Sequence, residues 1–343
     1  MYEQTLIGLD IGRSAVKVVA SANGREYQVT YPALVCQGIE LSDENSIRLA
    51  EPETVVVEGR KYFTGDTARL QGGVTASVGL SNDWTETLEY QALVLSAIKR
   101  LKRIGVPGLE TAYVVVGTPA ALYSKQRDRL EEITRKAMPN ADVKALSQPM
   151  GAFLSFFMDA KGLPISENYA DEIGRKKSWA VIEVGHFTTD FLLMKEGIHI
   201  DRKSESCEGV FMAAEQLARI LSAKNIDASP VACEEALRTK KIRHFGVKDV
   251  AAEVADAADF IVAKIMAKTN ALLAAEAATV DGILLAGGGA PIIYDSLVAQ
   301  WPHIILLPEP RMAVAEGFCR FGKGHLLKRA ASITVKQKVV VNG

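Results

Sequence analysis

Residues 181–193 read Val-Ile-Glu-Val-Gly-His-Phe-Thr-Thr-Asp-Phe-Leu-Leu, and this stretch decides the fold. An apolar run enters a turn centred on Gly185, hydroxyl side chains follow, and a second apolar run leaves. The pattern predicts a β-hairpin whose tight turn exposes backbone N–H groups beside Thr188 and Thr189. A concave row of N–H donors suits a phosphate group, and the flanking carboxylates suit a hydrated cation.

The same arrangement occurs near the N-terminus, where residues 6–19 read Leu-Ile-Gly-Leu-Asp-Ile-Gly-Arg-Ser-Ala-Val-Lys-Val-Val. An apolar strand again ends in acid, any residue, glycine, here at Asp10 and Gly12, and a second strand follows. One such turn is weak evidence, because Asp and Gly occupy turns for purely local reasons. Two of them, each between apolar strands, predict a duplicated domain that grips one polyphosphate from both sides.

Length and composition narrow the class of protein. The 343 residues suffice for two domains with separate cores. The formal net charge of −1 does not indicate direct contact with nucleic acid or with a membrane surface. Four cysteines without a C-x-x-C pair argue against a disulfide framework or a zinc site, and they favour a reducing compartment. Because neither a leader nor a membrane-length apolar run occurs, we expect a soluble cytoplasmic protein.

Strand patterns alternate with helix patterns along the chain, which predicts the α/β class. Helices are expected at residues 84–104, 124–138, 148–158, 250–279 and 311–321, the last interrupted by Gly317. Strands are expected at 111–116, 143–146, 282–286 and 304–307. The polar segment 161–177 is the best candidate for a linker, and the basic tail from His325 is assigned no structure.

Four motifs stand in a fixed order that spans nearly the whole chain, and the helix that begins at Ala313 follows them. They are Asp10-Ile11-Gly12, Gln148-Pro149-Met150-Gly151-Ala152, Glu183-Val184-Gly185-x-x-Thr188-Thr189-Asp190 and Ala286-Gly287-Gly288-Gly289. This order resembles the actin-type ATPase superfamily, and within it the bacterial plasmid-segregation actins of the ParM/StbA group. The resemblance implies two duplicated RNase H-like domains around a nucleotide cleft, each with a small insertion.

The implied domain I comprises residues 1–155 and 311–343, with an insertion at about 26–65. The implied domain II comprises residues 156–310, with an insertion at about 222–250. The resemblance also implies that the Gly151-Ala152 pair and Gly317 fall on the two helices that form the interdomain hinge in this superfamily.

The resemblance also assigns roles to residues. Asp10 acts on the hydration shell of Mg²⁺, Gln148 orients the attacking water, and Glu183 polarises that water and holds Mg²⁺ through water. The first phosphate loop supplies Gly12, Arg13, Ser14 and Lys17. The second loop and its neighbours supply Gly185, His186, Phe187, Thr188, Glu208 and Gly209, and the adenosine loop supplies Gly287, Gly288 and Gly289. The family usually has Asp where this chain has Glu183, so the carboxylate moves by about one methylene, which bears on metal geometry and hydrolysis rate.

Simpler interpretations exist for each motif taken alone. Asp10 and Glu183 are each typical of acids that cap turns, and residues 287–289 are typical of a turn from strand to helix. The glycine run is not a Rossmann fingerprint, because its glycines are contiguous and no early G-x-G-x-x-G opens a βαβ unit. The joint order of the motifs favours the nucleotide site over these readings.

The function expected from the resemblance is slow hydrolysis of ATP to ADP and phosphate, dependent on Mg²⁺ and linked to polymerisation. The filament would contact DNA through a DNA-binding adaptor protein, with no direct nucleic-acid or membrane contact. One alternative is a small-molecule kinase of the same superfamily, although the short segments between motifs leave little material for a substrate pocket. The other is a non-polymerising scaffold ATPase or a rod-shape protein, but Met1-Tyr2-Glu3-Gln4 and the basic tail lack an amphipathic membrane-binding pattern.

Overall fold

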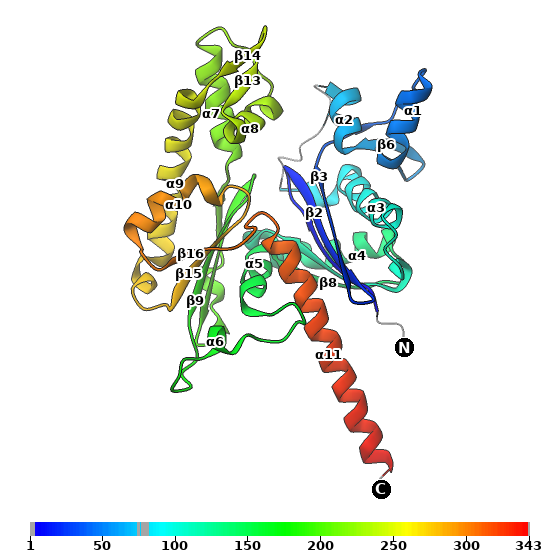
Figure 1. Cartoon of the computed structure of the whole chain (residues 1–343), viewed down its shortest axis with the longest axis vertical. Helices are drawn as coiled ribbons and strands as arrows, with labels where there is room; N and C mark the ends of the chain where they lie inside the picture. The colour runs from blue at the N-terminus through cyan, green and yellow to red at the C-terminus, as the bar shows by residue number, and fades with distance from the viewer. Residues whose placement is uncertain (1–3, 74–75, 77–81, 342–343) are drawn as a thin grey trace. The chain divides into compact units, whose positions relative to one another are not determined.

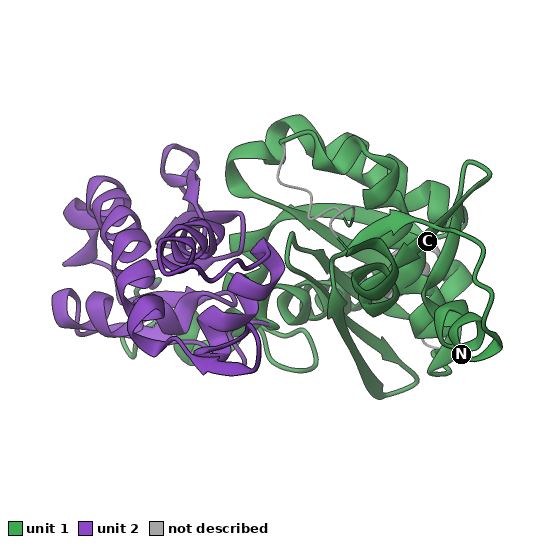
Figure 2. Ribbon diagram, turned by 90° about the horizontal axis from the view of Figure 1, so that it is seen from above, with its two compact units in different colours: residues 1–176, 312–343 green, residues 177–311 purple. Residues whose placement is uncertain are grey.

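The computed structural model describes residues 4–73, 76 and 82–341, so the first three residues of the N-terminal segment considered above lie outside it. The chain divides into two compact units, unit 1 (residues 1–176 and 312–343) and unit 2 (residues 177–311), coloured separately in Figure 2. Each unit has its own β-sheet (Figure 1) and its own apolar core. Within the described residues, no helix combines the length and apolarity needed to cross a bilayer.

The main sheet of unit 1 has five strands in the order β3-β2-β1-β7-β8. The strands are β1 (Leu6–Ile11), β2 (Ala15–Ala22), β3 (Arg25–Pro32), β7 (Tyr113–Thr118) and β8 (Asp142–Ser147). Strands β1, β2 and β3 form an antiparallel meander, whereas β7 and β8 run parallel to β1. The predicted N-terminal hairpin is therefore β1–β2, and it lies in the middle of the sheet.

Four helices of unit 1 pack on its sheet: α3 (Leu88–Arg103), α4 (Tyr123–Ala137), α5 (Gln148–Phe157) and α11 (Ala313–Val341). The short helix α6 (Ser166–Tyr169) packs on α5. Helix α3 begins where Thr87 Oγ1 accepts a hydrogen bond from the backbone N–H of Tyr90. It ends with basic residues in its last turn, where they interact favourably with the helix dipole.

The sheet of unit 2 follows the same path, β11-β10-β9-β15-β16, with β12 also paired to β10. Its strands are β9 (Trp179–Val184), β10 (Thr188–Lys195), β11 (Ile198–His199), β12 (Ser206–Glu208), β15 (Gly282–Ala286) and β16 (Ile304–Leu306). Its helices are α7 (Phe211–Ser222), α8 (Pro230–Thr239), α9 (Ala251–Ala277) and α10 (Ala290–Gln300). Between α8 and α9 lies a small hairpin, β13 (Lys241–Arg243) and β14 (Val247–Asp249).

The two sheets confirm the predicted duplication and the α/β class. In each, a central hairpin (β1–β2 or β9–β10) is antiparallel, and two further strands extend the sheet in parallel from the first strand of that hairpin. Parallel pairs need crossover connections, which the helical segments between these strands supply.

The insertion of unit 1 begins later than the sequence pattern suggested. The predicted range of about 26–65 includes β3, but β3 pairs with β2 over all eight residues and belongs to the main sheet. The insertion instead comprises β4 (Val35–Gln37), α1 (Glu44–Ala50), β5 (Thr54–Val57), β6 (Arg60–Thr64) and α2 (Gly65–Gly72). Strand β3 was misassigned because its outward positions are polar, as on an edge strand.

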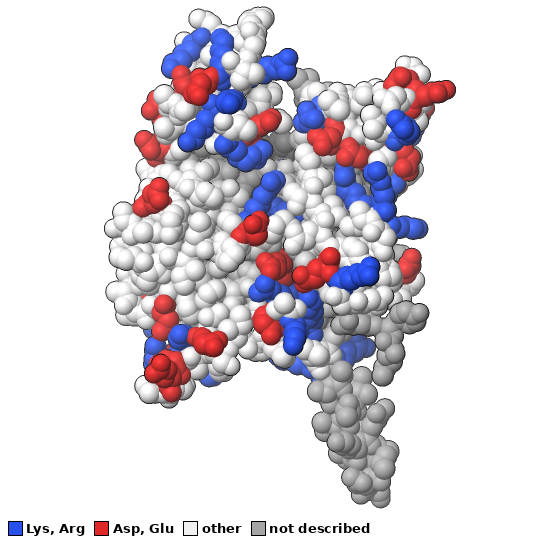
Figure 3. All heavy atoms as spheres, viewed as in Figure 1, with Lys and Arg blue, Asp and Glu red and all other residues white. Residues whose placement is uncertain are grey.

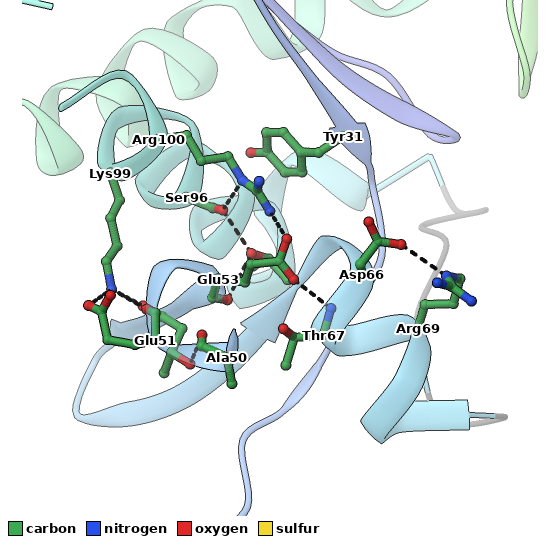
Figure 4. Close-up of polar contacts among 12 residues, drawn as sticks. Tyr31, Ala50, Glu51, Glu53, Asp66, Thr67, Arg69, Ser96, Lys99 and Arg100 are labelled. Atoms are coloured by element: carbon green, nitrogen blue, oxygen red, sulfur yellow. Dashed lines mark hydrogen bonds and ion pairs between the residues drawn. The ribbon is translucent and has the colours of Figure 1, made fainter. Parts of the chain in front are cut away.

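A polar network holds this insertion against α3 (Figure 4). Arg100 of α3 donates from Nη2 to Glu53 Oε1 at 2.6 Å, and its guanidinium lies 4.0 Å from the ring centroid of Tyr31. The other oxygen of Glu53 accepts from the backbone N–H of Thr67, in the first turn of α2, at 2.6 Å. Both charged side chains are largely buried, so their pairing fixes the orientation of the insertion on α3.

The division between units falls after Lys176, not after residue 155 as predicted. The segment expected to be a linker, residues 161–177, is hydrogen-bonded to unit 1. Ile165 donates from its backbone N–H to Phe157 O, and the Asn168 side chain donates to Phe156 O at 2.7 Å. Gly162 packs against the backbone of α11 at Gly324. The polar composition of residues 161–177 predicted a linker, but the segment is hydrogen-bonded within unit 1 and belongs to it.

Helix α11 also differs from the prediction. It continues through Gly317 without interruption and through the basic tail to Val341, where the sequence was assigned no structure. Its first turns pack against α5 and β1 of the same unit, and Arg320 donates to the carbonyls of Ser155 and Met158 at the end of α5. Gly317 is a packing position, because a Cβ there would overlap the backbone carbonyl of Gly151.

Candidate functional site

Three of the predicted site residues in unit 1 contact one another directly. Asp10, near the end of β1, is 1% exposed. The antiparallel register places Lys17 of β2 opposite it, and Lys17 Nζ lies 2.6 Å from Asp10 Oδ2. Gln148, the first residue of α5, donates from Nε2 to Asp10 Oδ1 at 2.8 Å. Both carboxylate oxygens are therefore fixed by polar side chains from different elements.

Arg13 lies in the turn of this hairpin, but its side chain is buried and packs over the ring of Trp84, 5.6 Å from the ring centroid. Burial lowers the pKa of Arg13 to about 10, and the nearby Tyr90 hydroxyl opposes that shift. The side chain is thus held by packing inside unit 1. A contribution of residue 13 to phosphate binding would come from its backbone.

The turns of the two central hairpins have matching backbone geometry. A Cβ built on Gly12 would lie 2.9 Å from the carbonyl oxygen of Ala15, and one built on Gly185 would lie 2.8 Å from that of Thr188. In each turn the carbonyl oxygen of the third residue after the glycine therefore lies against it, so a side chain at either glycine would force the turn open. This match supports the duplicated phosphate loops predicted from the sequence.

The second loop is anchored by the start of α7. Backbone N–H groups of Gly209, Val210 and Phe211 donate to the carbonyls of Phe187, Gly185 and His186, at 2.8, 3.1 and 2.8 Å. These hydrogen bonds to the start of α7 hold the three carbonyl groups of the second loop in place. Gly209 tolerates no side chain, because a Cβ there would meet the carbonyl oxygens of residues 185 and 186.

Glu183 lies where the second loop meets the glycine triplet. It is 5% exposed, and a Cβ built on Gly287 would lie 2.6 Å from its Oε1. Gly287 also has φ of +92°, a conformation that favours glycine. Gly289 donates from its backbone N–H to Val184 O at 2.9 Å, and a Cβ there would overlap Val184 and Val210. Structural packing thus accounts for two of the three glycines.

Gly288 has no such structural explanation. A Cβ built there would have Arg311 Cγ as its nearest neighbour, at an ordinary contact distance of 3.7 Å, and its φ lies outside the range that favours glycine. The backbone is therefore open at the head of α10, which suits the close approach of a ligand. Asp10 in unit 1 and Glu183 in unit 2 are each buried carboxylates, and carboxylate oxygens are groups that suit a hydrated Mg²⁺.

The structure also shows supporting residues that the sequence did not single out. Asp190 is fully buried and accepts from Thr188 Oγ1 at 2.7 Å and from Ser206 Oγ at 2.5 Å, so it orients the hydroxyl of the second loop. Arg311 lies against Gly288. Burial lowers the pKa of Arg311, with a further contribution from Arg238. Of these two residues, only Asp190 could have been found from the sequence, because it ends the motif Glu183-Val184-Gly185-x-x-Thr188-Thr189-Asp190.

Two predicted residues have charged neighbours on helices outside the loop. His186 Nδ1 lies 3.6 Å from Glu234 Oε1 on α8, and its ring packs near Phe211. Glu208 ends β12, and its half-exposed carboxylate lies 3.8 Å from Lys264 Nζ on α9. The structure thus brings together Asp10, Lys17 and Gln148 in unit 1. In unit 2 it brings together Glu183, the second loop and the glycine triplet.

Comparison with protein families matches both parts of the chain. Residues 8–151 match the model of the N-terminal domain of actin-like proteins. Residues 181–299 match the C-terminal model of the archaeal actin homologue family that is described as MreB-like. A comparison with curated protein sequences finds no match.

Solved structures with the same fold cover almost the whole chain. A 15-stranded ParM filament from Clostridium botulinum has a TM-score of 0.76 at 17% identity, over 94% of this chain and 99% of that one. The archaeal actin homologue Ta0583 in complex with ADP has a TM-score of 0.67 at 17% identity, over 95% and 100%. ParM from Bacillus thuringiensis with ATP has a TM-score of 0.61 at 12% identity, over 95% and 99%. These likenesses confirm the predicted two-domain fold.

Proposed function

The chain belongs to the actin-like superfamily, and from this premise we propose that it binds ATP, hydrolyses it to ADP and phosphate, and polymerises under control of the nucleotide. The observation that carries the proposal is the pair of matching glycine turns, each beside a buried carboxylate, Asp10 in one and Glu183 in the other. Solved relatives bind ADP or ATP, and one forms a filament, which supports both parts of the proposal.

In the proposed chemistry the protein positions groups and neutralises charge, with little covalent work of its own. When bound, Mg²⁺ supplies charge neutralisation at the phosphates, and Asp10 and Glu183 hold it through water. Lys17, now paired with Asp10, offsets phosphate charge, and Gln148 orients the attacking water. Residues 12–14 and 185–188 bind the phosphates through their backbone, and residues 287–289 bind the nucleoside portion. Glu208 and Gly209 support the second loop through their backbone.

We further propose that the filament works in the cytoplasm to segregate plasmid or other DNA through a DNA-binding adaptor. The near-zero net charge fits indirect contact with DNA better than direct binding. Head-to-tail contacts between copies propagate into an open polymer when the rotation from one copy to the next does not close a ring.

The proposed function is tested by right-angle light scattering of the full-length protein after addition of Mg-ATP, with phosphate release followed in parallel. We expect scattering to rise with Mg-ATP and to decay as phosphate appears, and to stay flat with Mg-ADP or with ATP and EDTA. Scattering that is flat with Mg-ATP at every protein concentration would exclude polymerisation. Turnover only after addition of a small-molecule acceptor would indicate a kinase instead.

The openness at Gly288 gives a separate prediction about where the nucleotide binds. Gly288→Ala is expected to weaken ATP binding about tenfold or more, because the added methyl group occupies the space a ligand would use. Its thermal stability should match or slightly exceed that of the wild type, since the backbone conformation suits alanine. Titration with a fluorescent ATP analogue measures the first effect, and thermal unfolding the second.

Gly289→Ala is the contrasting variant, since its methyl group would overlap Val184 and Val210 and should lower stability instead. Unchanged nucleotide affinity in Gly288→Ala would contradict the assignment of this loop.

A further inference from the structure

The hairpin β13–β14, labelled at one end of unit 2 in Figure 1, exposes apolar side chains at its turn. Phe245 is 99% exposed and has φ of +50°, in the left-handed region that bulky residues rarely adopt. Val247 is 71% exposed. The turn closes through a hydrogen bond from the backbone N–H of His244 to the carbonyl oxygen of Gly246, which needs no aromatic residue between them. Folding buries neither apolar side chain, so both are available for contact with another molecule.

The pairing of the two strands decides which side chains share a face of the hairpin. Arg243 lies opposite Val247. Ile242 is buried in the core of unit 2, which fixes the inward face. Because side chains alternate along a strand, Lys241, Arg243 and Val247 lie on the outward face, next to the turn that carries Phe245. The exposed apolar side chains therefore lie beside cations.

The hairpin as a whole is strongly basic. Residues 240–249 carry four cations and a single acid, Asp249, which gives a net charge of +3, and the cations are Lys240, Lys241, Arg243 and Lys248. The C-terminal half of α8, from Glu235, adds one acid and one cation and leaves that charge unchanged. Figure 3 shows Lys and Arg side chains gathered at the end of unit 2 that carries this hairpin. We call Phe245, Val247 and the four cations the basic tip.

Within the part of the chain that the structure describes, the four cations of the basic tip form no ion pair with an acid. Asp249 accepts a hydrogen bond from the backbone N–H of Ala251, at the start of α9. On the neighbouring helix, Glu253 is already paired with Lys224 at 2.6 Å. The positive charge of the tip is therefore not compensated by its own unit, and we expect its partner to be anionic.

The mixture of apolar and cationic groups discriminates between classes of anionic partner. Duplex nucleic acid supplies phosphates for the cations, but it takes an apolar side chain only by unstacking a base step, which costs free energy. A protein partner needs a preformed apolar cavity inside an acidic surface. The surface of an anionic bilayer supplies both environments, because its phosphates lie directly above an apolar region that accepts a side chain of any shape. A bilayer therefore fits the basic tip with the fewest conditions.

The spacing of the tip residues suits the depth of a bilayer interface. Arg243 precedes Phe245 by two residues, so the two positions lie at most about 7 Å apart along the strand. Interfacial protein segments bury their apolar face about 5–10 Å into the boundary between headgroups and acyl chains. With Phe245 at that depth, Arg243 lies at the level of the lipid phosphates.

We propose that the basic tip binds the surface of a bilayer that contains anionic phospholipids. Phe245 and Val247 enter the boundary between headgroups and acyl chains, and the four cations bind lipid phosphates. Each copy carries one tip, so the binding of a single copy is weak and reversible. The net charge of −1 and the sequences of the two termini gave no indication of such a contact, because neither reports on a single hairpin.

This inference goes beyond the proposed function and does not depend on it, because one copy suffices for the contact. The first test is flotation of the full-length protein with lipid vesicles in the absence of nucleotide. Vesicles of phosphatidylcholine alone are compared, at low salt, with vesicles that also contain about 30% phosphatidylglycerol. We expect the wild type to float only with the anionic vesicles.

Phe245→Ala should lower the partition constant for the anionic vesicles about tenfold, as for the loss of one buried aromatic side chain. The matched control is Phe260→Ala, a truncation at an exposed phenylalanine of α9 that lies outside the tip. It should change the partition constant by less than about twofold. Thermal unfolding should be the same for both variants and the wild type.

The cations are tested by Lys241→Gln combined with Arg243→Gln. We expect this double variant to lower the partition constant for anionic vesicles about tenfold or more, and about 0.5 M NaCl to abolish binding of the wild type. Lys102→Gln combined with Arg103→Gln is the matched control, because it removes two exposed cations of unit 1 and changes the net charge equally. Its binding should stay close to that of the wild type.

Phe245→Trp tests insertion directly. On addition of anionic vesicles, the indole emission should shift to the blue and should be quenched by brominated lipids, because the ring enters the apolar boundary. Phe260→Trp should show neither change. The native tryptophans are the same in both variants, so their emission cancels in the comparison.

The inference is overturned if the wild type does not float with anionic vesicles at low salt, or if Phe245→Ala floats as well as the wild type. Equal binding to neutral vesicles would exclude the role of the cations. Without vesicle binding, loss of DNA binding by Phe245→Ala in a gel-shift assay would make the tip a nucleic-acid surface. Loss of Mg-ATP-dependent assembly instead would make it a contact between copies. Each of these results leaves the proposed ATPase and filament function standing, because that function is tested by light scattering and phosphate release without lipid.

Discussion

ATP turnover by Asp10→Asn is expected to fall by about a hundredfold or more while the protein stays folded. The carboxylate is 1% exposed and is held between Lys17 and Gln148, so its charge and position are both fixed. Asparagine has the same shape. Its side-chain oxygen can face Lys17 while the Gln148 amide turns to accept from its NH₂ group, so hydrogen bonds survive and only the charge is lost. Without that charge, the variant lacks a carboxylate for the hydrated Mg²⁺.

Phosphate release under saturating Mg-ATP measures the effect, and binding of a fluorescent ATP analogue shows whether the nucleotide still binds. The matched control is Asp66→Asn, because Asp66 is also an aspartate of unit 1 but is half-exposed and pairs with Arg69 on the surface. Its turnover should equal that of the wild type. Undiminished phosphate release by Asp10→Asn would remove Asp10 from the proposed site.

The central hairpins could be predicted from sequence because their signal is local. Apolar runs on both sides of an acid-x-glycine turn determine strand, turn and strand within about fourteen residues, as in the β1–β2 hairpin. The order of motifs then identified the duplicated fold. The sheets confirm this, since β1–β2 and β9–β10 occupy equivalent places. The assignment of phosphate-binding roles stays a prediction, although the contacts of Asp10 and the openness at Gly288 support it.

The predictions were wrong where the structure of a segment depends on contacts with residues far away in the sequence. Strand β3 has a polar outer face, and only its pairing with β2 makes it part of the main sheet. Segment 161–177 has the composition of a linker, but its hydrogen bonds to α5 place it in unit 1. Helix α2 was not among the expected helices, and its first turn depends on Glu53, which accepts from the N–H of Thr67 although it lies fourteen residues earlier in the chain. No pattern in the sequence predicted that Arg311 lies next to Gly288.

The largest effect on stability is expected from Gly317→Ala on α11. Gly317 lies against α5, and the atoms that a Cβ would meet there belong to the backbone of Gly151 and Ser155. Backbone atoms in a packed helix cannot move aside as a side-chain tip can, so the two helices would have to separate. Alanine is the better helix former by about 1 kcal/mol, but overpacking a tight contact costs about 1–3 kcal/mol or more. The steric cost therefore exceeds the gain in helix propensity.

Urea unfolding followed by circular dichroism should show a clear loss of stability for Gly317→Ala. Gly322→Ala is the matched control on the same helix, because its nearest neighbours are the side chains of Leu6 and Tyr113, at 3.3 and 3.4 Å. Those side chains can shift by a few tenths of an ångström, so the helix-propensity gain should offset most of the cost. Equal stability of the two variants would mean that α5 and α11 can separate at this crossing without loss. In that case the close glycine contact would serve motion of the helices and not their packing.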